Sequence, residues 1–295
     1  MKTSLGWALA PALLVGSFAS SYAADLPLKA RPMAAAVASW TGYYIGVNGG
    51  YAGGQDRIDV NPTLVFGNAG LVGGTAFGAA SAAAYTNRSG NTDAAFLGGQ
   101  AGYNWQIAPA WIVGLEADIQ GFWTINNRSL ASLAPPAGFP ANPLSHLQTF
   151  TDKVDALATF RGRTGALVSP NLLLYVTGGL AVGDVKAGTT ITQQVLGPSA
   201  LPNAYTSVGY LSEVRVGWVA GAGVEWMTKQ PWSIKLEGLY YDLGSRNFAS
   251  SPLQNFNNVG TLFTSSVPVS HVNFNGYLLR AGINWHFNGP VVARY

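Results

Sequence analysis

Hydrophobic and polar residues alternate along most of the chain, from residue 40 to residue 287. Eight segments carry their apolar side chains mainly at alternate positions, interrupted in places by glycine or threonine: 43–51, 97–105, 111–120, 158–166, 172–182, 214–226, 234–240 and 277–287. Small or polar residues lie between them, except that 172–182 is more apolar on both faces. A period of two is the pattern of a β-strand with one apolar face. The sequence therefore predicts an all-β, antiparallel fold of eight strands, each about ten residues long, which is the length that a tilted strand needs to cross a bilayer.

The connections between these segments alternate in length. Short links lie at 107–110, 169–171 and 228–231, whereas the other four links span about 39, 29, 26 and 28 residues. Soluble meanders favour short hairpins throughout, but outer-membrane barrels have short periplasmic turns and long outer loops. Alternation alone would also fit a soluble sandwich or a lipocalin-like barrel. The connection lengths favour an eight-stranded, up-and-down transmembrane β-barrel with four long outer loops and three short periplasmic turns.

Composition narrows the classes further. Hydrophobic residues make up 48% of the chain and charged residues only 10%, yet no apolar run reaches the 18 residues of a transmembrane helix. The absence of cysteine excludes disulfide frameworks, thiolate metal sites and cysteine nucleophiles. A formal net charge of +3 is too small to imply a nucleic-acid partner. Because neither histidines nor carboxylates cluster along the sequence, we expect no metal and no cofactor.

The N-terminus predicts export. Lys2 is followed by an apolar stretch from Leu5 to Phe18, and small residues at Ser21 and Ala23 mark a cleavage site. These features predict a signal peptide over residues 1–23, cleaved after Ala23. Residues 24–39 are rich in Ala and Pro and are expected to form a periplasmic tether. The barrel is then expected over 40–287 and a C-terminal tail over 288–295.

Tryptophan placement is an independent indication of a membrane. Six tryptophans fall at one end of the predicted up-and-down barrel, the end that carries the short turns: Trp40, Trp105, Trp111, Trp226, Trp232 and Trp285. Indole rings favour the membrane–water interface, because the ring is apolar and its N–H group seeks water. We therefore predict that these six residues form a periplasmic aromatic girdle.

The charges inside the predicted strands all lie opposite the apolar positions. On the lipid face each Arg or Lys would cost roughly 2–4 kcal/mol at the midplane, so we place them in the lumen. Counted from the periplasmic rim, Glu116 is level with Arg163, Asp118 with Arg161, and Glu237 with Arg280. We predict one paired lumen charge network of Glu116, Asp118, Arg161, Arg163, Lys235, Glu237 and Arg280.

The lumen of eight strands is just wide enough for side chains to fill. The network is therefore expected to act as a charge-satisfied plug, since an unpaired buried charge would cost several kcal/mol. The alternative is a narrow or gated polar path whose charges set selectivity.

Three motifs resemble the alphaproteobacterial outer-membrane β-barrel proteins, which are often labelled immunogenic or porin-like. Residues 40–51 (WTGYYIGVNGGY) resemble their first strand, 160–165 (FRGRTG) with 174–181 (LYVTGGLA) their central hairpin, and 280–287 (RAGINWHF) their last strand. The resemblance covers essentially the whole mature chain, over divergent loops. It implies a Gram-negative outer-membrane barrel of OmpA-like topology, without settling an activity.

The same resemblance implies a terminal aromatic signal that the barrel assembly machinery reads. In this chain the residues in phase for that signal are Tyr277, Ile283, Trp285 and Phe287. The chain continues to Tyr295, so either Phe287 is read internally or Tyr295 takes its place, and we favour Phe287.

Catalytic chemistry has little support in the sequence. Asp242 and His271 bracket the fourth long loop and could meet across a hairpin, as a general acid–base pair must. A polar pair at the rim is the simpler interpretation, and no serine lies in a nucleophile-elbow setting. We therefore expect no enzymatic activity.

The four outer loops are longer than barrel closure requires. Long loops on rigid scaffolds often bind ligands, and five phenylalanines fall among them: Phe139, Phe150, Phe248, Phe256 and Phe263. We predict a structural role in envelope integrity and surface presentation, with outer-membrane lipid and lipopolysaccharide as partners. The alternatives are a small porin or gated channel, and an adhesin or haem and ligand binder that acts through the loops.

Overall fold

The computed structural model describes residues 39–64, 86–124, 128–134, 144–195, 205–228, 231–256 and 262–287, and these residues form β-strands, turns and short connections. The signal peptide, most of the tether and the C-terminal tail predicted above lie outside the described residues. No helix in the described part of the chain has the length and hydropathy to span a membrane. The strands are β1 (Gly42–Leu64), β2 (Thr86–Ala108), β3 (Trp111–Thr124), β4 (Arg128–Ala134), β5 (Leu144–Ser169), β6 (Leu172–Val195), β7 (Tyr205–Met227), β8 (Trp232–Ala249), β9 (Leu253–Phe256) and β10 (Leu262–His286).

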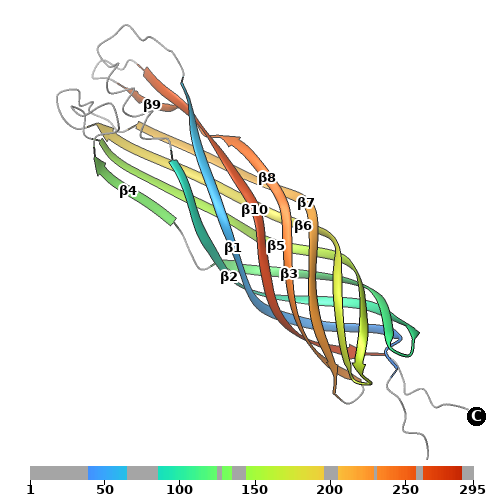
Figure 1. Cartoon of the computed structure of the whole chain (residues 1–295). Helices are drawn as coiled ribbons and strands as arrows, with labels where there is room; N and C mark the ends of the chain where they lie inside the picture. The colour runs from blue at the N-terminus through green and yellow to red at the C-terminus, as the bar shows by residue number, and fades with distance from the viewer. Residues whose placement is uncertain are drawn as a thin grey trace, which may run out of the picture. The chain divides into compact units, whose positions relative to one another are not determined.

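The first and last long strands pair with each other and close the sheet. The hydrogen-bonded order is β1-β2-β3-β5-β6-β7-β8-β10, and β10 returns to β1 along a register that runs from Tyr44 opposite His286 to Leu64 opposite Ser266. All of these pairings are antiparallel. The described strands thus form a ring of eight, as predicted, and Figure 1 shows their common tilt. The short strands β4 and β9 attach to β5 and β10 at the end of the ring opposite the short turns.

The strands are much longer than the predicted ten residues. The ring strands have between 14 and 26 residues, and most extend well into the segments predicted as loops. The prediction of strand length was wrong because the hydropathy pattern changes along the strand. On β6, for example, outward positions beyond Val182 include Lys186, Thr190 and Thr192, so this part of the strand no longer shows an apolar face.

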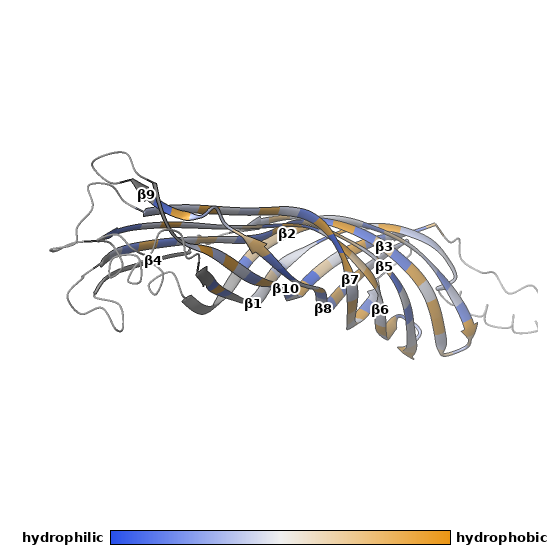
Figure 2. Cartoon of the chain, turned by 90° about the horizontal axis from the view of Figure 1, so that it is seen from above, coloured by the Kyte–Doolittle hydropathy of each residue, from blue (hydrophilic) through white to orange (hydrophobic). Residues whose placement is uncertain are grey.

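The outward positions of the predicted segments carry the apolar side chains. Tyr43, Val47 and Leu279 have exposed fractions of 67%, 61% and 65%, and Figure 2 shows hydrophobic and hydrophilic residues alternating along the strands. Five of the six predicted girdle tryptophans are also exposed at the end with the short turns: Trp105, Trp111, Trp226, Trp232 and Trp285. The period of two therefore predicted the lipid face and the lumen face correctly.

Trp40 was wrongly assigned to this girdle. Its side chain is fully buried and packs with Ile112, Leu173 and Met227 at the periplasmic end of the lumen. Its indole N–H donates to the carbonyl of Pro170 in the β5–β6 turn at 3.1 Å. Trp40 precedes the first ladder pair, so the strand's alternation does not fix its direction. We call Trp40, Ile112, Leu173 and Met227 the periplasmic cap.

A second ring of aromatic residues marks the other membrane boundary, and the sequence reading missed it. Its members are exposed: Tyr51, Trp123, Trp218, Tyr240 and Tyr277. Trp218, Tyr240 and Tyr277 each lie eight residues along their strand from a tryptophan of the first girdle. On β3 the two boundaries are Trp111 and Trp123, a span comparable with the 9–11 residues of a tilted transmembrane strand. We call this second ring the outer girdle. Beyond it the walls of β1, β5, β6, β7 and β10 continue out of the membrane.

The two boundaries predict different responses to the same charge. Leu236 faces lipid midway between Trp232 and Tyr240, so Leu236→Arg should lower the free energy of unfolding by about 2–4 kcal/mol. Thr190→Arg, on the exposed outer face of β6 beyond the outer girdle, should change it by less than about 0.5 kcal/mol. Urea titration of the protein folded into phospholipid vesicles measures both values. Equal losses would contradict the membrane boundary.

Candidate functional site in the barrel lumen

Arg161 of β5 is the centre of a cluster of charged side chains inside the lumen. Its guanidinium donates to Asp118 Oδ2 of β3 at 2.7 Å and to Glu237 Oε1 of β8 at 3.0 Å. It also pairs with Glu116 of β3, and its Nε donates to the Thr159 hydroxyl at 3.0 Å. The side chain is fully buried. Three carboxylates, two from the neighbouring strand β3 and one from β8 across the ring, therefore compensate one guanidinium in a site closed to bulk water.

Glu116 is the second centre of this cluster, on the acidic side. Lys235 Nζ donates to both of its carboxylate oxygens at 2.8 Å, and the Tyr44 hydroxyl donates to Oε2 at 2.6 Å. Arg280 Nη2 lies 3.3 Å from Oε1, and Arg163 Nη1 lies 3.5 Å from Oε2. These partners come from β8, β1, β10 and β5, so Glu116 connects strands on opposite sides of the barrel.

Glu225 of β7 extends the cluster toward the periplasm. Arg163 Nη2 donates to its Oε2 at 2.9 Å. Its other oxygen accepts hydrogen bonds from the Ser233 hydroxyl at 2.6 Å and from Asn284 Nδ2 at 2.8 Å, and His286 Nε2 lies 3.4 Å away. This branch approaches the periplasmic cap, because Trp40 contacts the His286 ring edge-on with centroids 6.1 Å apart.

Two tyrosines hold Arg163 between their rings. The guanidinium carbon lies 5.0 Å from the ring centroid of Tyr44 and 5.0 Å from that of Tyr175, within the range of cation–π attraction. The Tyr175 hydroxyl donates to Glu237 Oε1 at 3.0 Å. The aromatic rings thus fix the position of Arg163 while their hydroxyls satisfy carboxylates.

The cluster is balanced in charge. Its acidic members face an equal number of basic members, and all are at most 6% exposed: Glu116, Asp118, Glu225 and Glu237 with Arg161, Arg163, Lys235 and Arg280. We call these eight residues the lumen charge network. A balanced set meets the requirement that buried charges be paired, which the seven residues of the prediction, with three acids and four bases, would not.

The structure brings all seven predicted network residues together, but in a different register. Glu237 lies opposite Arg280, as predicted. Glu116, however, lies opposite Arg161 rather than Arg163. Counting from the rim failed because the strands are staggered, so that Trp111 pairs with Ala166 and not with the last residue of β5.

The sequence reading missed three members of the site. Glu225 is one of the strand charges expected in the lumen, but the predicted network does not include it, and it includes neither Tyr44 nor Tyr175. The alternation along the strand could have placed both tyrosines in the lumen, since Tyr44 and Tyr175 directly follow the outward-facing Tyr43 and Leu174.

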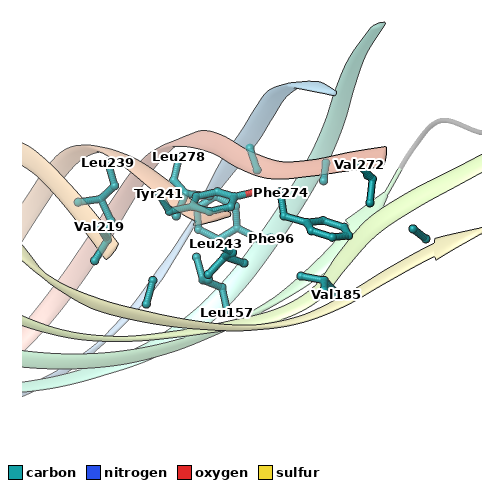
Figure 3. Packing of buried hydrophobic residues seen from close by; sticks show 14 of the residues in the cluster. Phe96, Leu157, Val185, Val219, Leu239, Tyr241, Leu243, Val272, Phe274 and Leu278 are labelled. Carbon is teal, nitrogen blue, oxygen red and sulfur yellow. The ribbon is translucent and has the colours of Figure 1, made fainter. Parts of the chain in front are cut away.

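An apolar layer fills the lumen on the outer side of the charge network. Figure 3 shows side chains that converge from several strands, among them Phe96 of β2, Leu157 of β5, and Tyr241 and Leu243 of β8. Most of its members are almost completely buried: Ala52, Phe96, Leu157, Ala181, Val185, Val219, Leu239, Tyr241, Leu243, Phe274 and Leu278, with Phe122 of β3 packed against them. We call this layer the apolar septum. Every strand of the ring contributes to it.

Two of the five phenylalanines assigned to outer loops belong instead to this buried cluster. Phe150 lies on β5 and Phe248 on β8, with exposed fractions of 3% and 8%. The assignment failed because the strands extend beyond the segments with an apolar outer face. Phe139 lies outside the described residues, and Phe256 and Phe263 lie on β9 and β10.

Beyond the septum the lumen becomes polar again. His146, Gln148, Thr189, Gln193 and Ser270 are all buried there. Gln193 Nε2 lies 2.9 Å from His146 Nδ1, and His146 Nε2 lies 3.2 Å from Gln148 Oε1. Both contacts fit a neutral imidazole that accepts at Nδ1 and donates from Nε2. Burial lowers the pKa of His146 and favours the same neutral ring.

The candidate catalytic pair does not assemble. On the β8–β10 ladder Asp242 lies opposite Asn275, whereas His271 lies opposite Asn247, further along the strands. Asp242 Oδ1 accepts the backbone N–H of Gly244 at 2.7 Å, and His271 Nδ1 contacts the side chain of Asn247. The two residues therefore have separate partners.

The residues expected to form the assembly signal all face outward. Tyr277, Ile283, Trp285 and Phe287 share one face of β10 and its end, with exposed fractions between 39% and 60%. Tyr295 lies outside the described residues.

Removing one charge from the network should destabilise the barrel strongly. Glu116→Gln removes the carboxylate that Arg161, Lys235 and Arg280 all contact, and loss of a buried partner costs about 3–5 kcal/mol. Glu213→Gln is the matched control, because its pairs with Arg215 and Arg246 are partly exposed and worth less than about 1 kcal/mol. Urea titration in vesicles compares the two variants. Similar small losses would show that the network does not stabilise the barrel.

Acid should weaken the barrel wall beyond the membrane through His146. Because burial lowers the folded-state pKa of His146, the stability from the neutral ring is fully present above the unfolded pKa, and it is lost as the pH falls from there through the lower folded-state pKa. Amide hydrogen exchange of β5, corrected for its intrinsic pH dependence, should show faster opening at about pH 5.5 than at about pH 7.5. His146→Gln should remove this difference. An acid effect of the same size in the variant would assign it to another group.

Comparison with known proteins identifies the family. The family model described as "outer membrane protein beta-barrel domain" matches residues 12–287. The 31 kDa outer-membrane immunogenic proteins of Brucella melitensis and Brucella suis are each 31% identical to this chain over 283 residues, covering 91% of this chain and 94% of the relative. Among solved structures, the outer membrane protein OprG of Pseudomonas aeruginosa covers 83% of this chain and 97% of its own, with 12% identity and a TM-score of 0.35. The family model and the Brucella relatives, together with the closed ring and its lipid-facing surface, confirm the resemblance: the chain belongs to the family of outer-membrane β-barrel proteins.

Proposed function

We propose that the chain is a non-conducting structural barrel that supports the outer membrane and carries its long outer connections at the cell surface. The observation that carries the proposal is the apolar septum, which lies directly beyond the lumen charge network and receives side chains from every strand of the ring. Each layer alone would hinder an ion, and an ion that crosses the barrel has to pass both.

The charge network opposes the passage of ions because its side chains are paired with one another. A permeating ion would have to replace partners of buried side chains such as Arg161 and Glu116, which have contacts with several strands. Leaving a buried charge without its partner costs several kcal/mol. The network therefore favours a fixed arrangement over a path that opens at each passage.

The septum opposes the passage of ions because it is apolar and excludes water. Phe96, Leu157 and Leu243 offer an ion no polar group to replace its hydration shell, and hydrophobic constrictions close channels by excluding water. The cavity that adjoins the septum, beside Phe122 and Phe274, measures about 40 Å³. That volume holds only a few water molecules.

The small-porin alternative has one observation in its favour. The lumen is polar beyond the septum, at Gln148 and Gln193, and charged below it, as a selective path would be. In that case the septum would have to move aside to connect the two polar regions.

Surface presentation is the second part of the proposal. The Brucella relatives are named as immunogenic outer-membrane proteins, and we extend surface exposure to this chain because β5, β6 and β7 continue beyond the outer girdle. A catalytic step is not part of the proposal, since Asp242 and His271 have separate partners. A loop-borne ligand or adhesin function would add to this role without replacing it.

Planar-bilayer recording separates a closed barrel from a channel. We expect no discrete conductance steps from the mature protein, and none from the charge-balanced double variant Glu116→Gln/Arg161→Gln, because the septum persists in both. Steps should appear only when Leu157→Ala, Leu243→Ala and Phe274→Ala open the septum of that double variant.

The control for these recordings is the inserted state of each protein, shown by the heat-dependent shift of the folded barrel on an unboiled gel. Discrete steps from the unmodified protein, or from the double variant alone, would favour the channel. Silence of the combined variant in a folded barrel would mean that a further layer closes the lumen.

A further inference from the structure

A groove crosses the lipid-facing surface of β1, β2, β3 and β5. The ladder registers place Ile45, Ala101, Ala117 and Phe160 in one row across these strands. The two alanines in the middle form the floor, between Ile45 and Phe160, which are 52% and 56% exposed. Tyr43, Tyr103 and Leu115 form the wall on the periplasmic side, and the groove has a volume of about 720 Å³.

The groove runs obliquely from the periplasmic side of the membrane toward the outer girdle. Tyr43 and Ile45 lie at the start of β1, near the periplasmic girdle, whereas Phe160 lies well away from the periplasmic end of β5. A row of paired residues runs across the strands, so it is inclined to the membrane plane when the strands tilt by about 35–45°. The row spans three intervals between these four strands at about 4.8 Å each, or roughly 14 Å, and at this tilt it rises about 8–10 Å from Ile45 to Phe160. Phe160 lies opposite Leu180 of β6, which lies opposite Trp218 of the outer girdle.

We propose that this groove binds one acyl chain of a phospholipid from the periplasmic leaflet. The groove is continuous with the lipid-contact surface of the barrel, so its occupant has to be apolar along its length. Its lower end lies at the interface, beside the packed rings of Tyr43 and Tyr103 with centroids 4.5 Å apart. A chain that enters there and runs toward Phe160 keeps its headgroup in the interface and its methylene groups on the floor at Ala101 and Ala117.

A second copy of the barrel fits this groove less well. Two barrels are both convex, so they touch along their most exposed side chains, here Ile45 and Phe160. The floor at Ala101 and Ala117 lies between these side chains, where a flexible chain can follow it. The inference does not depend on whether the lumen conducts.

Native mass spectrometry tests the proposal on the full mature protein. The barrel is reconstituted in vesicles of palmitoyl-oleoyl phosphatidylethanolamine and transferred to detergent, and the bound phospholipid is counted. We expect one retained phospholipid per barrel, and at least a tenfold lower occupancy in Ala101→Leu/Ala117→Leu, because the added side chains fill the floor. Ala117→Val should give an intermediate loss and requires less adaptation of the fold.

The matched control is Ala220→Leu/Ala281→Leu, which adds the same side chains to lipid-facing positions of β7 and β10 outside the groove. This control should retain phospholipid as the unmodified protein does. Equal retention in the groove variants and the control would overturn the proposal, as would the absence of retained phospholipid in the unmodified protein. A dimer mass that disappears only in the groove variants would assign the groove to a second copy and likewise overturn it.

Discussion

Inside the hydrocarbon layer no water is available to the backbone, so each peptide group has to find its partner within the protein. The pairing of β1 with β10 meets this requirement by leaving the ring without an edge. Closure also gives each strand one face toward lipid and one toward the lumen, and charged side chains are excluded from the lipid face. Arg161, Glu116 and Glu237 are thereby directed to a narrow interior, where they come within hydrogen-bonding distance. The charge network is thus a consequence of closure and alternation together.

The layers of the lumen strengthen one another. The septum on one side and the periplasmic cap on the other keep bulk water away from the network, and ion pairs are stronger where the surroundings are less polar. In turn, the network fixes side chains from β1, β3, β5, β7, β8 and β10 in one register. The periplasmic cap, the charge network and the septum follow one another along the lumen, so the barrel is packed from inside along its membrane-embedded length. The same sequence of layers makes the lumen a poor path for ions.

The sequence predicts the part of this fold that contacts lipid and fails beyond it. Where one face meets hydrocarbon, as at Leu236, the period of two is strong and both the strand and its orientation follow. Beyond the outer girdle the outward residues are Lys186, Thr190 and similar side chains, so strands were taken for loops and Phe150 was placed outside the lumen. The register between Glu116 and Arg161 was missed for another reason. The stagger of neighbouring strands is a property of the closed ring, and no local pattern encodes it.

The walls beyond the outer girdle connect the membrane-embedded layers with the surface role. On β6 the chain continues from Leu180, which lies opposite Trp218 of the girdle, to Val195. At about 3.3 Å per residue and a barrel tilt of about 35–45°, these strands rise roughly 30 Å or more from the membrane. The septum is part of a larger buried apolar cluster that extends into this wall through Val185 and Phe248, and this cluster supports the wall from inside. A filled lumen therefore does more than exclude ions, because it stiffens a wall that no longer has lipid around it.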